Sequence, residues 1–396
     1  MTKRTIIRLV SLVLFTVLAL CVLPETVREA NGILPRLSPL LNLGGALGAR
    51  QFVGWWLLLG VPLLVLPFVK GRFFCWWICP MGFVAEMVSR VSPSKLRLAK
   101  IPWIGKGLAL VIVASACAGY PLLIWLDPLC IFNGFFAAWR MPIAWASAIL
   151  STGFFSILVA SLIIPNVWCH RLCPLGGLQE WLMHCARAIR GRGKGTTSAS
   201  TDSPVVDRRV FMGFAVSGVA GLTARKFLGK KTSEVIRPPG AVETAFNALC
   251  ARCGNCMKAC PYGLIVPDLG ESGIDGLLTP VIKFRSKNYA QERFCFQECV
   301  ACTNVCPTGA IQALSVEKKK QTTIGVAKLD KIACIAWEKK EYCVVCQEYC
   351  PYQAVNEEER DGVQCPSIDE SKCIGCGACE SQCPALPIAI IITGKP

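Results

Sequence analysis

The sequence predicts an α-helical membrane domain, four helices built as a two-fold repeat plus a fifth helix, followed by a cysteine-rich α+β domain. Three observations carry this prediction. The 396 residues are 53% hydrophobic with a mean hydropathy of +0.47, apolar runs fill the first half, and seventeen of the 25 cysteines, sixteen of them in repeated motifs, gather in Cys250–Cys383. A chain this apolar is typical of an integral membrane protein, and its length suits two or three domains.

Four apolar runs predict the membrane-spanning helices, at 6–23, 52–69, 105–125 and 143–164. Each is near the ~20 residues that a bilayer core requires. Basic residues follow the second and fourth runs, which places both of these loops in the cytoplasm. The net charge of +16 is concentrated in residues 1–240 and is interpreted as loop charge beside an anionic membrane surface, so the sequence does not favour nucleic-acid binding.

An internal repeat lies within this helical region. CWWICPMGFVAE at 75–86 matches CHRLCPLGGLQE at 169–180 in its two cysteines, its proline, a glycine and the final glutamate. Because a pseudo-two-fold repeat brings both copies towards one axis, the hypothesis is one redox or metal site formed by Cys75, Cys79, Cys169 and Cys173. The alternative is small buried cysteines at helix ends. Glu86 and Glu180 are candidate proton carriers. The alternative is that these glutamates cap helices or face water.

The cysteine-rich half contains four motifs of the form Cys-x2-Cys-x2-Cys-x3-Cys-Pro. Two of them have this spacing and two have a longer first interval. The regular spacing is the bacterial ferredoxin spacing for [4Fe–4S] clusters, so the second domain is expected to be ferredoxin-like with four clusters. A zinc ribbon would stop at two Cys-x2-Cys pairs per metal, and a disulfide scaffold has no reason to repeat the Cys-x3-Cys-Pro ending. The candidate iron ligands are Cys250, Cys253, Cys256, Cys260, Cys295, Cys299, Cys302, Cys306, Cys334, Cys343, Cys346, Cys350, Cys373, Cys376, Cys379 and Cys383.

A twin arginine separates the two halves. Arg208 and Arg209 precede a Gly-rich, moderately apolar run that is typical of a twin-arginine export signal, a pathway that moves folded proteins. The alternative is an amphipathic or docking helix that leaves the clusters inside the cell. The predicted segments are thus 1–185 (four-helix membrane domain), 186–209 (basic Ser/Thr-rich linker), 210–228 (fifth membrane segment), 229–241 (second linker) and 242–396 (cluster domain).

With these motifs in place, the chain resembles membrane-bound polyferredoxins related to the NapH and NapG subunits of periplasmic nitrate reduction, fused in one polypeptide. Residues 1–185 are similar to the NapH-type quinol dehydrogenase core, and residues 205–396 to NapG/MauM-type ferredoxins. One departure is that NapH-type proteins usually carry a cytoplasmic ferredoxin after the fourth helix, where this chain has only the linker. The resemblance also implies a ligand pairing in which the outer motifs share two clusters and the inner motifs share two. The expected groups are Cys250/Cys253/Cys256 with Cys383, Cys373/Cys376/Cys379 with Cys260, Cys295/Cys299/Cys302 with Cys350, and Cys334/Cys343/Cys346 with Cys306.

The function expected from these features is electron transfer. The sequence has no Cys-x-x-Cys-His haem motif and no dinucleotide-binding turn, so a membrane quinone is the plausible hydrophobic partner. Electrons would pass from quinol through the clusters to a periplasmic or membrane-docked oxidoreductase, with the twin-arginine translocase acting during assembly. The expected location is the bacterial inner membrane, multi-pass, with a periplasmic ferredoxin domain. The alternatives are a redox-sensing or assembly protein that supplies electrons for maturation of another metalloenzyme, and a cytoplasm-facing ferredoxin.

No residue stands out in the sequence as a quinone ligand. The tryptophans near the second helix are interpreted as interfacial belt residues, namely Trp55, Trp56, Trp76 and Trp77. Five cysteines lie outside all of these motifs and are expected to be single buried thiols, namely Cys21, Cys117, Cys130, Cys185 and Cys365.

Overall fold

The computed structural model describes residues 3–20, 32–50, 55–92, 102–139, 144–191, 208–228, 235–285 and 293–394. The chain divides into two compact units. The first, called the helical unit below, comprises residues 1–230, 242–255 and 307–310; the second, the cysteine-rich unit, comprises 231–241, 256–306 and 311–396. The division falls within the first cysteine motif, so Cys250 and Cys253 belong to the helical unit.

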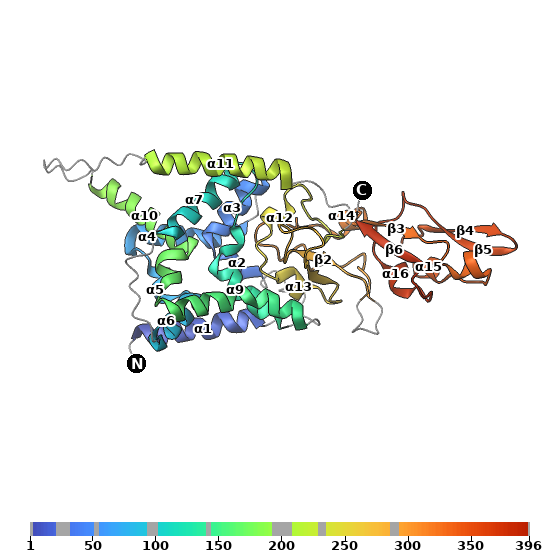
Figure 1. Cartoon of the computed structure of the whole chain (residues 1–396), viewed down its shortest axis with the longest axis horizontal. Helices are drawn as coiled ribbons and strands as arrows, with labels where there is room; N and C mark the ends of the chain where they lie inside the picture. Colours follow the sequence, from blue (N-terminus) through green and yellow to red (C-terminus); the bar gives the residue numbers. More distant parts are fainter. Residues whose placement is uncertain are drawn as a thin grey trace. The chain divides into compact units, whose positions relative to one another are not determined.

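The helical unit is built from helices of very different length. Several begin with proline at the first position, as in α6 and α8, because proline fixes a helical φ and its missing N–H has no partner to lose there. Figure 1 shows α11 beside α7, and α6 beside α1 and α9, and these helices are in contact. The elements are α1 (Lys3–Leu20), α2 (Ile33–Arg36), α3 (Pro39–Ala49), η2 (Trp55–Gly60), α4 (Val61–Lys70), α5 (Phe73–Trp77), α6 (Pro80–Val91), α7 (Ile104–Cys117), η4 (Ile124–Leu126), α8 (Pro128–Ala138), α9 (Ala144–Ile163), η5 (Trp168–Leu172), α10 (Pro174–Gly191), α11 (Arg208–Leu228) and α12 (Phe246–Leu249).

The prediction of an α-helical membrane domain is wrong, because across the described parts of the chain no helix is both long enough and apolar enough to cross a membrane. The 18 residues of α1 include three basic ones. The second predicted span is divided into η2 and α4 at Gly60, and the third shortens to the 14 residues of α7, which is ~21 Å of helix. The fourth corresponds to α9, whose apolar side chains are accompanied by Ser151, Thr152 and Ser156. The predicted multi-pass location in the inner membrane is wrong for the same reason.

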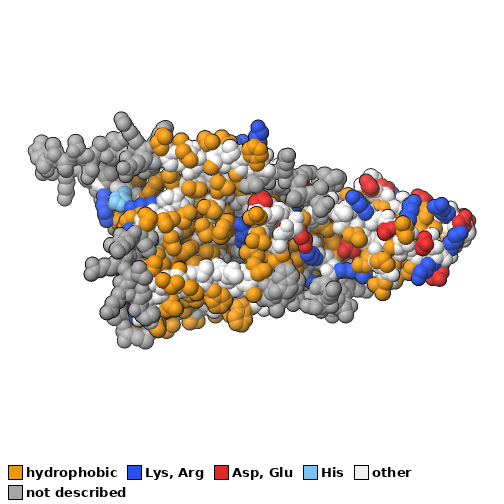
Figure 2. All heavy atoms as spheres, viewed as in Figure 1, with side chains coloured by type: hydrophobic (Ala, Val, Ile, Leu, Met, Phe, Trp, Pro, Cys, Tyr) orange, Lys and Arg blue, Asp and Glu red, His pale blue; other side chains and the backbone are white. Residues whose placement is uncertain are grey.

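The core of the helical unit is one continuous set of buried side chains. It contains large aliphatic and aromatic residues such as Phe132 and Met81, and it also encloses Cys79, Cys130 and Cys253. Apolar side chains also cover much of the visible surface of this unit (Figure 2). Val10 of α1 is one of its exposed apolar side chains. These three thiols therefore lie in surroundings with little polar screening.

The cysteine-rich unit has short elements, because its cysteine loops take up much of the chain. Its strands form three separate antiparallel pairs, β1 with β2, β3 with β6 and β4 with β5. The β4–β5 hairpin turns at Asp361-Gly362, both with positive φ, as a two-residue hairpin turn requires. The elements are α13 (Asn255–Ala259), β1 (Ile265–Pro267), β2 (Pro280–Ile282), α14 (Val316–Lys320), β3 (Gly325–Leu329), η6 (Ile335–Lys339), α15 (Val345–Glu348), β4 (Val355–Arg360), β5 (Val363–Ile368), α16 (Ala378–Gln382) and β6 (Ile390–Gly394).

Two glycines explain why the last cysteine motif folds tightly. Gly375 and Gly377 both have positive φ, at +76° and +83°. A Cβ on Gly375 would lie 2.5 Å from the backbone of Gly325, and one on Gly377 would lie 2.1 Å from the ring of Phe284. Only glycine suits both the φ and the close approach, so these positions fix the loop that carries Cys373, Cys376 and Cys379.

Candidate functional site

One cavity of the cysteine-rich unit is surrounded by four thiols. They come from the end of the third cysteine motif and from the glycine-fixed loop of the fourth, and they are Cys350, Cys373, Cys376 and Cys379. Backbone N–H groups point at two of the sulfurs, from Ala354 to Cys350 at 3.3 Å and from Ala327 to Cys373 at 3.5 Å. Four cysteines around one apolar cavity, with N–H donors to sulfur, fit the ligand set of a [4Fe–4S] cluster.

A second cavity of this unit is lined by the thiols of Cys334, Cys343, Cys346 and Cys383. The eight residues between Cys334 and Cys343 include η6, so the irregular spacing of this motif becomes a folded insertion and all three cysteines still reach the cavity. Burial, followed by the charges of Cys334 and Cys343, raises the pKa of the Cys346 thiol to about 12. Crowded buried thiols of this kind lose their protons readily only when they bind a metal centre.

A third set of thiols gathers around a buried lysine. Burial, followed by the charges of Cys295, Cys260 and Cys299, raises the pKa of Cys302, so these four lie close together. The Lys319 side chain, 2% exposed, donates hydrogen bonds to the Cys299 carbonyl at 2.5 Å and to the thiol of Cys295. Burial raises the pKa of Cys295, and the nearby lysine opposes that shift. Lys319 is a functional candidate that the sequence does not reveal, because it is the middle residue of a run of three lysines.

These three sets are neighbours, which overturns the expected pairing. The Cys295 N–H donates to the Cys376 carbonyl at 2.9 Å, which joins the third set to the first. Burial and then neighbouring thiols, including Cys346, raise the pKa of Cys379, which joins the first set to the second. Cys260, Cys350 and Cys383, each the fourth cysteine of its motif, therefore reach the adjacent motif in the chain, and the predicted pairing of outer with outer and inner with inner motifs is wrong.

The remaining four motif cysteines divide between the units. Cys250 and Cys253 are buried in the helical unit, whereas Cys256 and Cys306 belong to the cysteine-rich unit. The Ile311 N–H donates to the Cys306 sulfur at 3.4 Å, as at the other cluster-type thiols.

The two Cys-x3-Cys-Pro segments have the same local geometry. In each, the second cysteine precedes a helix and its sulfur accepts a hydrogen bond from a glycine N–H, Gly82 to Cys79 and Gly176 to Cys173, both at 3.4 Å. A Cβ on either glycine would lie 3.1 or 3.2 Å from the carbonyl oxygen of the first cysteine of its own pair. The repeat in the sequence is thus a repeat of structure, α5–α6 and η5–α10.

The four thiols of this repeat come together in the helical unit. Burial, followed by the charges of Cys79 and Cys169, raises the pKa of Cys75, and burial followed by Cys75 and Cys169 raises that of Cys173. Within the described residues, no group of three or more His, Cys, Asp or Glu side chains converges tightly enough to hold a single metal ion. Cysteines around a [4Fe–4S] cluster are not expected to converge in this way, because each iron takes one cysteine.

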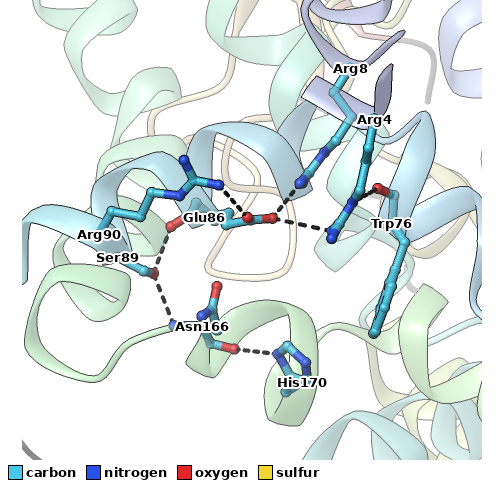
Figure 3. A network of polar contacts seen from close by, with 9 residues as sticks. Arg4, Arg8, Trp76, Glu86, Ser89, Arg90, Asn166 and His170 are labelled. Atoms are coloured by element: carbon cyan, nitrogen blue, oxygen red, sulfur yellow. Dashed lines mark hydrogen bonds and ion pairs between the residues drawn. The ribbon is translucent and has the colours of Figure 1, made fainter. Parts of the chain in front are cut away.

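A charged cavity of about 360 Å³ opens beside these thiols and is lined by Cys75 and Cys169 together with arginines, Glu86 and His170. Figure 3 shows three arginines that point at the Glu86 carboxylate. This carboxylate forms ion pairs with Arg8, with Arg90 at 3.0 Å and with Arg4 at 3.5 Å. Burial would raise the pKa of Glu86, but hydrogen bonds from Arg8 and Arg90 outweigh it and lower the pKa, so the carboxylate is ionised.

The second glutamate of the repeat is paired in the same way. Glu180 is 8% exposed and forms ion pairs with Arg72 and, at 3.6 Å, with Lys106. Both candidate proton carriers are therefore held by arginines of the helical unit. Trp76 is half exposed at the cavity, and the side chains of Trp55 and Trp56 lie outside the described residues.

The five cysteines outside the motifs differ in their surroundings. Cys130 and Cys365 are buried, at 1% and 2% exposed, as expected for single buried thiols. Cys117 and Cys185 are exposed, which contradicts that expectation. Cys21 and residues 192–207 of the predicted 186–209 linker lie outside the described residues.

Comparison with known families matches both halves of the chain. A family described as "4Fe-4S dicluster domain" matches residues 249–311, which hold the first two cysteine motifs. Families described as "4Fe-4S binding domain" match residues 52–99, 145–193 and 302–323, and residues 366–388. The first of these covers both Cys-x3-Cys-Pro segments. No solved structure matches the chain.

Similar curated proteins cover the same regions. The methylamine utilization ferredoxin-type protein MauM of Methylophilus methylotrophus is 34% identical over 190 residues, which is 45% of this chain and 80% of the relative. The ferredoxin-type protein NapG of Escherichia coli K12 is 33% identical over 182 residues, 43% of this chain and 75% of the relative. The ferredoxin-type protein NapH of Haemophilus influenzae is 25% identical over 150 residues, 36% of this chain and 50% of the relative. The resemblance seen in the motifs is confirmed, and the chain belongs to the family of MauM- and NapG-type ferredoxins, iron–sulfur proteins that transfer electrons.

Proposed function

We propose that this protein takes electrons from a quinol at its helical unit and passes them through four [4Fe–4S] clusters to a protein redox partner. The observation that carries the proposal is the row of three four-cysteine sets in the cysteine-rich unit, with the set of Cys373 between the other two. Each cluster, when bound, exchanges a single electron.

The residues of the chain prepare these sites for electron transfer. Burial of the thiols keeps water away from the sulfurs, and N–H groups such as those of Ala354 and Ala327 stabilise negative charge on them. Lys319 adds a positive charge beside one set only, so the four sites are expected to differ in reduction potential.

We propose the charged cavity beside Cys75 and Cys169 as the place where the quinol headgroup approaches. Its lining offers arginine donors for the quinol oxygens and the ring of Trp76, over which the Arg4 guanidinium lies at 5.1 Å. Oxidation of a quinol to a quinone releases two electrons and two protons. His170, which also lines the cavity and whose ring contacts the Asn166 carbonyl at 3.3 Å, is placed to accept one of these protons.

The four thiols beside the cavity are proposed as one further redox or metal site. Their support is that Cys75, Cys79, Cys169 and Cys173 lie together, two of them facing the cavity. A double variant, Cys75→Ser with Cys169→Ser, should lose reduction of the clusters by quinol and retain reduction by dithionite. Unchanged quinol-driven reduction, together with unchanged iron and labile sulfide, would remove this site from the proposal.

The test of the main proposal is anaerobic reduction of the purified protein. The four cubanes alone account for about 16 iron atoms and 16 labile sulfides per chain, because each contains four of both. Addition of a short-chain quinol should then bleach the cluster absorbance, whereas Trp76→Ala should slow this step without changing the iron content. Cys365→Ser is the matched control, because this buried thiol lies outside the four sets. Full cluster loading with no reduction by quinol would instead favour an assembly or redox-sensing protein.

We also propose Arg208 and Arg209 as part of a twin-arginine export signal, with the translocase as a partner in assembly. The support is the sequence pattern at the start of α11. Conversion of both residues to lysine should abolish export of a reporter fused at residue 396 while cluster loading stays the same. Export at the original level in that variant would refute this assignment.

A further inference from the structure

Helix α8 holds the first cysteine loop in place within the helical unit. The Asn133 side-chain amide donates to the Cys253 carbonyl at 2.5 Å and to the Asn255 side-chain oxygen at 2.8 Å. Gly254 has φ +74°, and a Cβ there would lie 2.4 Å from the Cβ of Ala137 on the same helix. The loop at 250–255 therefore rests directly on α8, and any side chain of α8 that faces it is fixed relative to the cluster ligands.

Cys130 lies one helical turn before Asn133, so the two side chains share a face of α8. Its thiol is 1% exposed, belongs to the same buried core as Cys253, and is hydrogen-bonded to the Cys253 thiol. When Cys253 binds iron, its sulfur is a thiolate and has no proton to give. The proton of this S–H···S contact must then belong to Cys130, which makes Cys130 the donor.

The start of α8 is built to keep Cys130 in this place. Asp127 caps the helix and is fully buried; its Oδ1 accepts hydrogen bonds from the N–H of Leu129 at 2.9 Å and of Cys130 at 3.4 Å. The hydroxyl of Ser38 donates to Oδ2 at 2.5 Å. The cap fixes the backbone of Cys130, and because its side chain is almost fully buried it has little freedom to turn away from the loop.

A purely space-filling role would predict no polar partner of this kind. Cys365 provides the comparison within the same chain: it is equally buried, but its thiol donates to the backbone carbonyl of Ala336 at 3.5 Å. The two thiols therefore differ in the atom that receives their proton, and of the two it is Cys130 that reaches the sulfur of a candidate iron ligand.

We propose that Cys130 is a positioning residue that donates a hydrogen bond to the sulfur of Cys253 and raises the reduction potential of the cluster that Cys253 binds. A donor to a ligand sulfur stabilises the additional negative charge of the reduced cluster, and hydrogen bonds to the sulfurs are one of the factors that set such potentials. The inference rests on the proposed function only in that Cys253 is a cluster ligand.

The experiment compares Cys130→Ala, Cys130→Ser and the control Cys365→Ala in the full-length, cluster-loaded protein. Potentiometric titration followed by electron paramagnetic resonance should show one cluster shifted to lower potential in Cys130→Ala, a potential near the original in Cys130→Ser, and no shift in Cys365→Ala. The shifted signal is assigned by its loss in Cys253→Ala. The hydroxyl of serine restores a donor, so this rescue separates hydrogen bonding from packing.

Two outcomes would overturn the inference. One is an unchanged set of potentials in Cys130→Ala with full iron content. The other is loss of the cluster from both Cys130 variants, which would make Cys130 a ligand or a packing residue. Failure of the proposed function itself would appear earlier and separately, as missing iron or missing quinol-driven reduction in the unaltered protein.

Discussion

Replacing Lys319 by methionine should lower the reduction potential of one cluster and leave the others unchanged. The ammonium group is buried, donates to the carbonyl of Cys299, and reaches the thiol of Cys295. A reduced cluster carries one more negative charge than an oxidised one, so a fixed positive charge beside it favours reduction. Methionine keeps most of the volume of the side chain and removes the charge.

The size of the shift follows from Coulomb's law. A charge hydrogen-bonded to a ligand sulfur lies ~6 Å from the centre of the cluster, and at an effective dielectric constant of ~20 the interaction is about 2.8 kcal/mol. For a one-electron couple, 59 mV corresponds to a factor of ten, so the expected decrease is at most ~120 mV.

The assay is a potentiometric titration of the full-length protein, with Lys320→Met as the matched control. Lys320 is the next residue of the same helix, but its side chain is 42% exposed and pairs with Glu298 at 3.5 Å. Water and salt screen that charge, so the control should shift no potential by more than ~20 mV. Equal shifts in both variants, or no shift in Lys319→Met at full iron content, would refute the reasoning.

Three further predictions follow from the geometry. Cys350→Ser should remove the same spectroscopic signal as Cys373→Ser, and two different lost signals would restore the outer-with-outer pairing. Burial raises the pKa of Asp127 to about 6, so the folded state prefers the protonated acid. The free energy of unfolding should therefore fall by about 3 kcal/mol as pH rises from ~4 to ~6, and Asp127→Asn should abolish that fall in urea titrations. Arg72→Met should lower the free energy of unfolding by about 3 kcal/mol, because it leaves the buried Glu180 carboxylate without its arginine partner. Arg90→Met, at an exposed ion pair, should lower it by less than ~1 kcal/mol. Equal decreases in the two variants would contradict the burial argument.

The repeated spacing of the sequence was enough to identify thiols that the structure gathers into sets of four, since cysteines two residues apart must share a loop. The helical half could not be judged in the same way. The apolar content predicted four membrane-spanning helices, but apolar content does not indicate where a helix ends. Gly60 divides one predicted span, and the chain after Cys117 leaves the helix at Gly119, whose φ of +82° is typical of a helix end. Hydropathy averaged over a window cannot show these breaks.

Ligand pairing and tuning depend on contacts that no local pattern encodes. In each motif three cysteines are fixed by their own loop, but the fourth follows the direction in which the chain leaves that loop. Cys350 reaches the set of Cys373 because the β4–β5 hairpin returns the chain directly to it. The same holds for Lys319 and Cys130, which stand outside every motif. Each of these two residues can affect a cluster only because the fold places its buried polar group beside a cysteine sulfur. The sequence shows neither that the residue is buried nor which sulfur lies beside it.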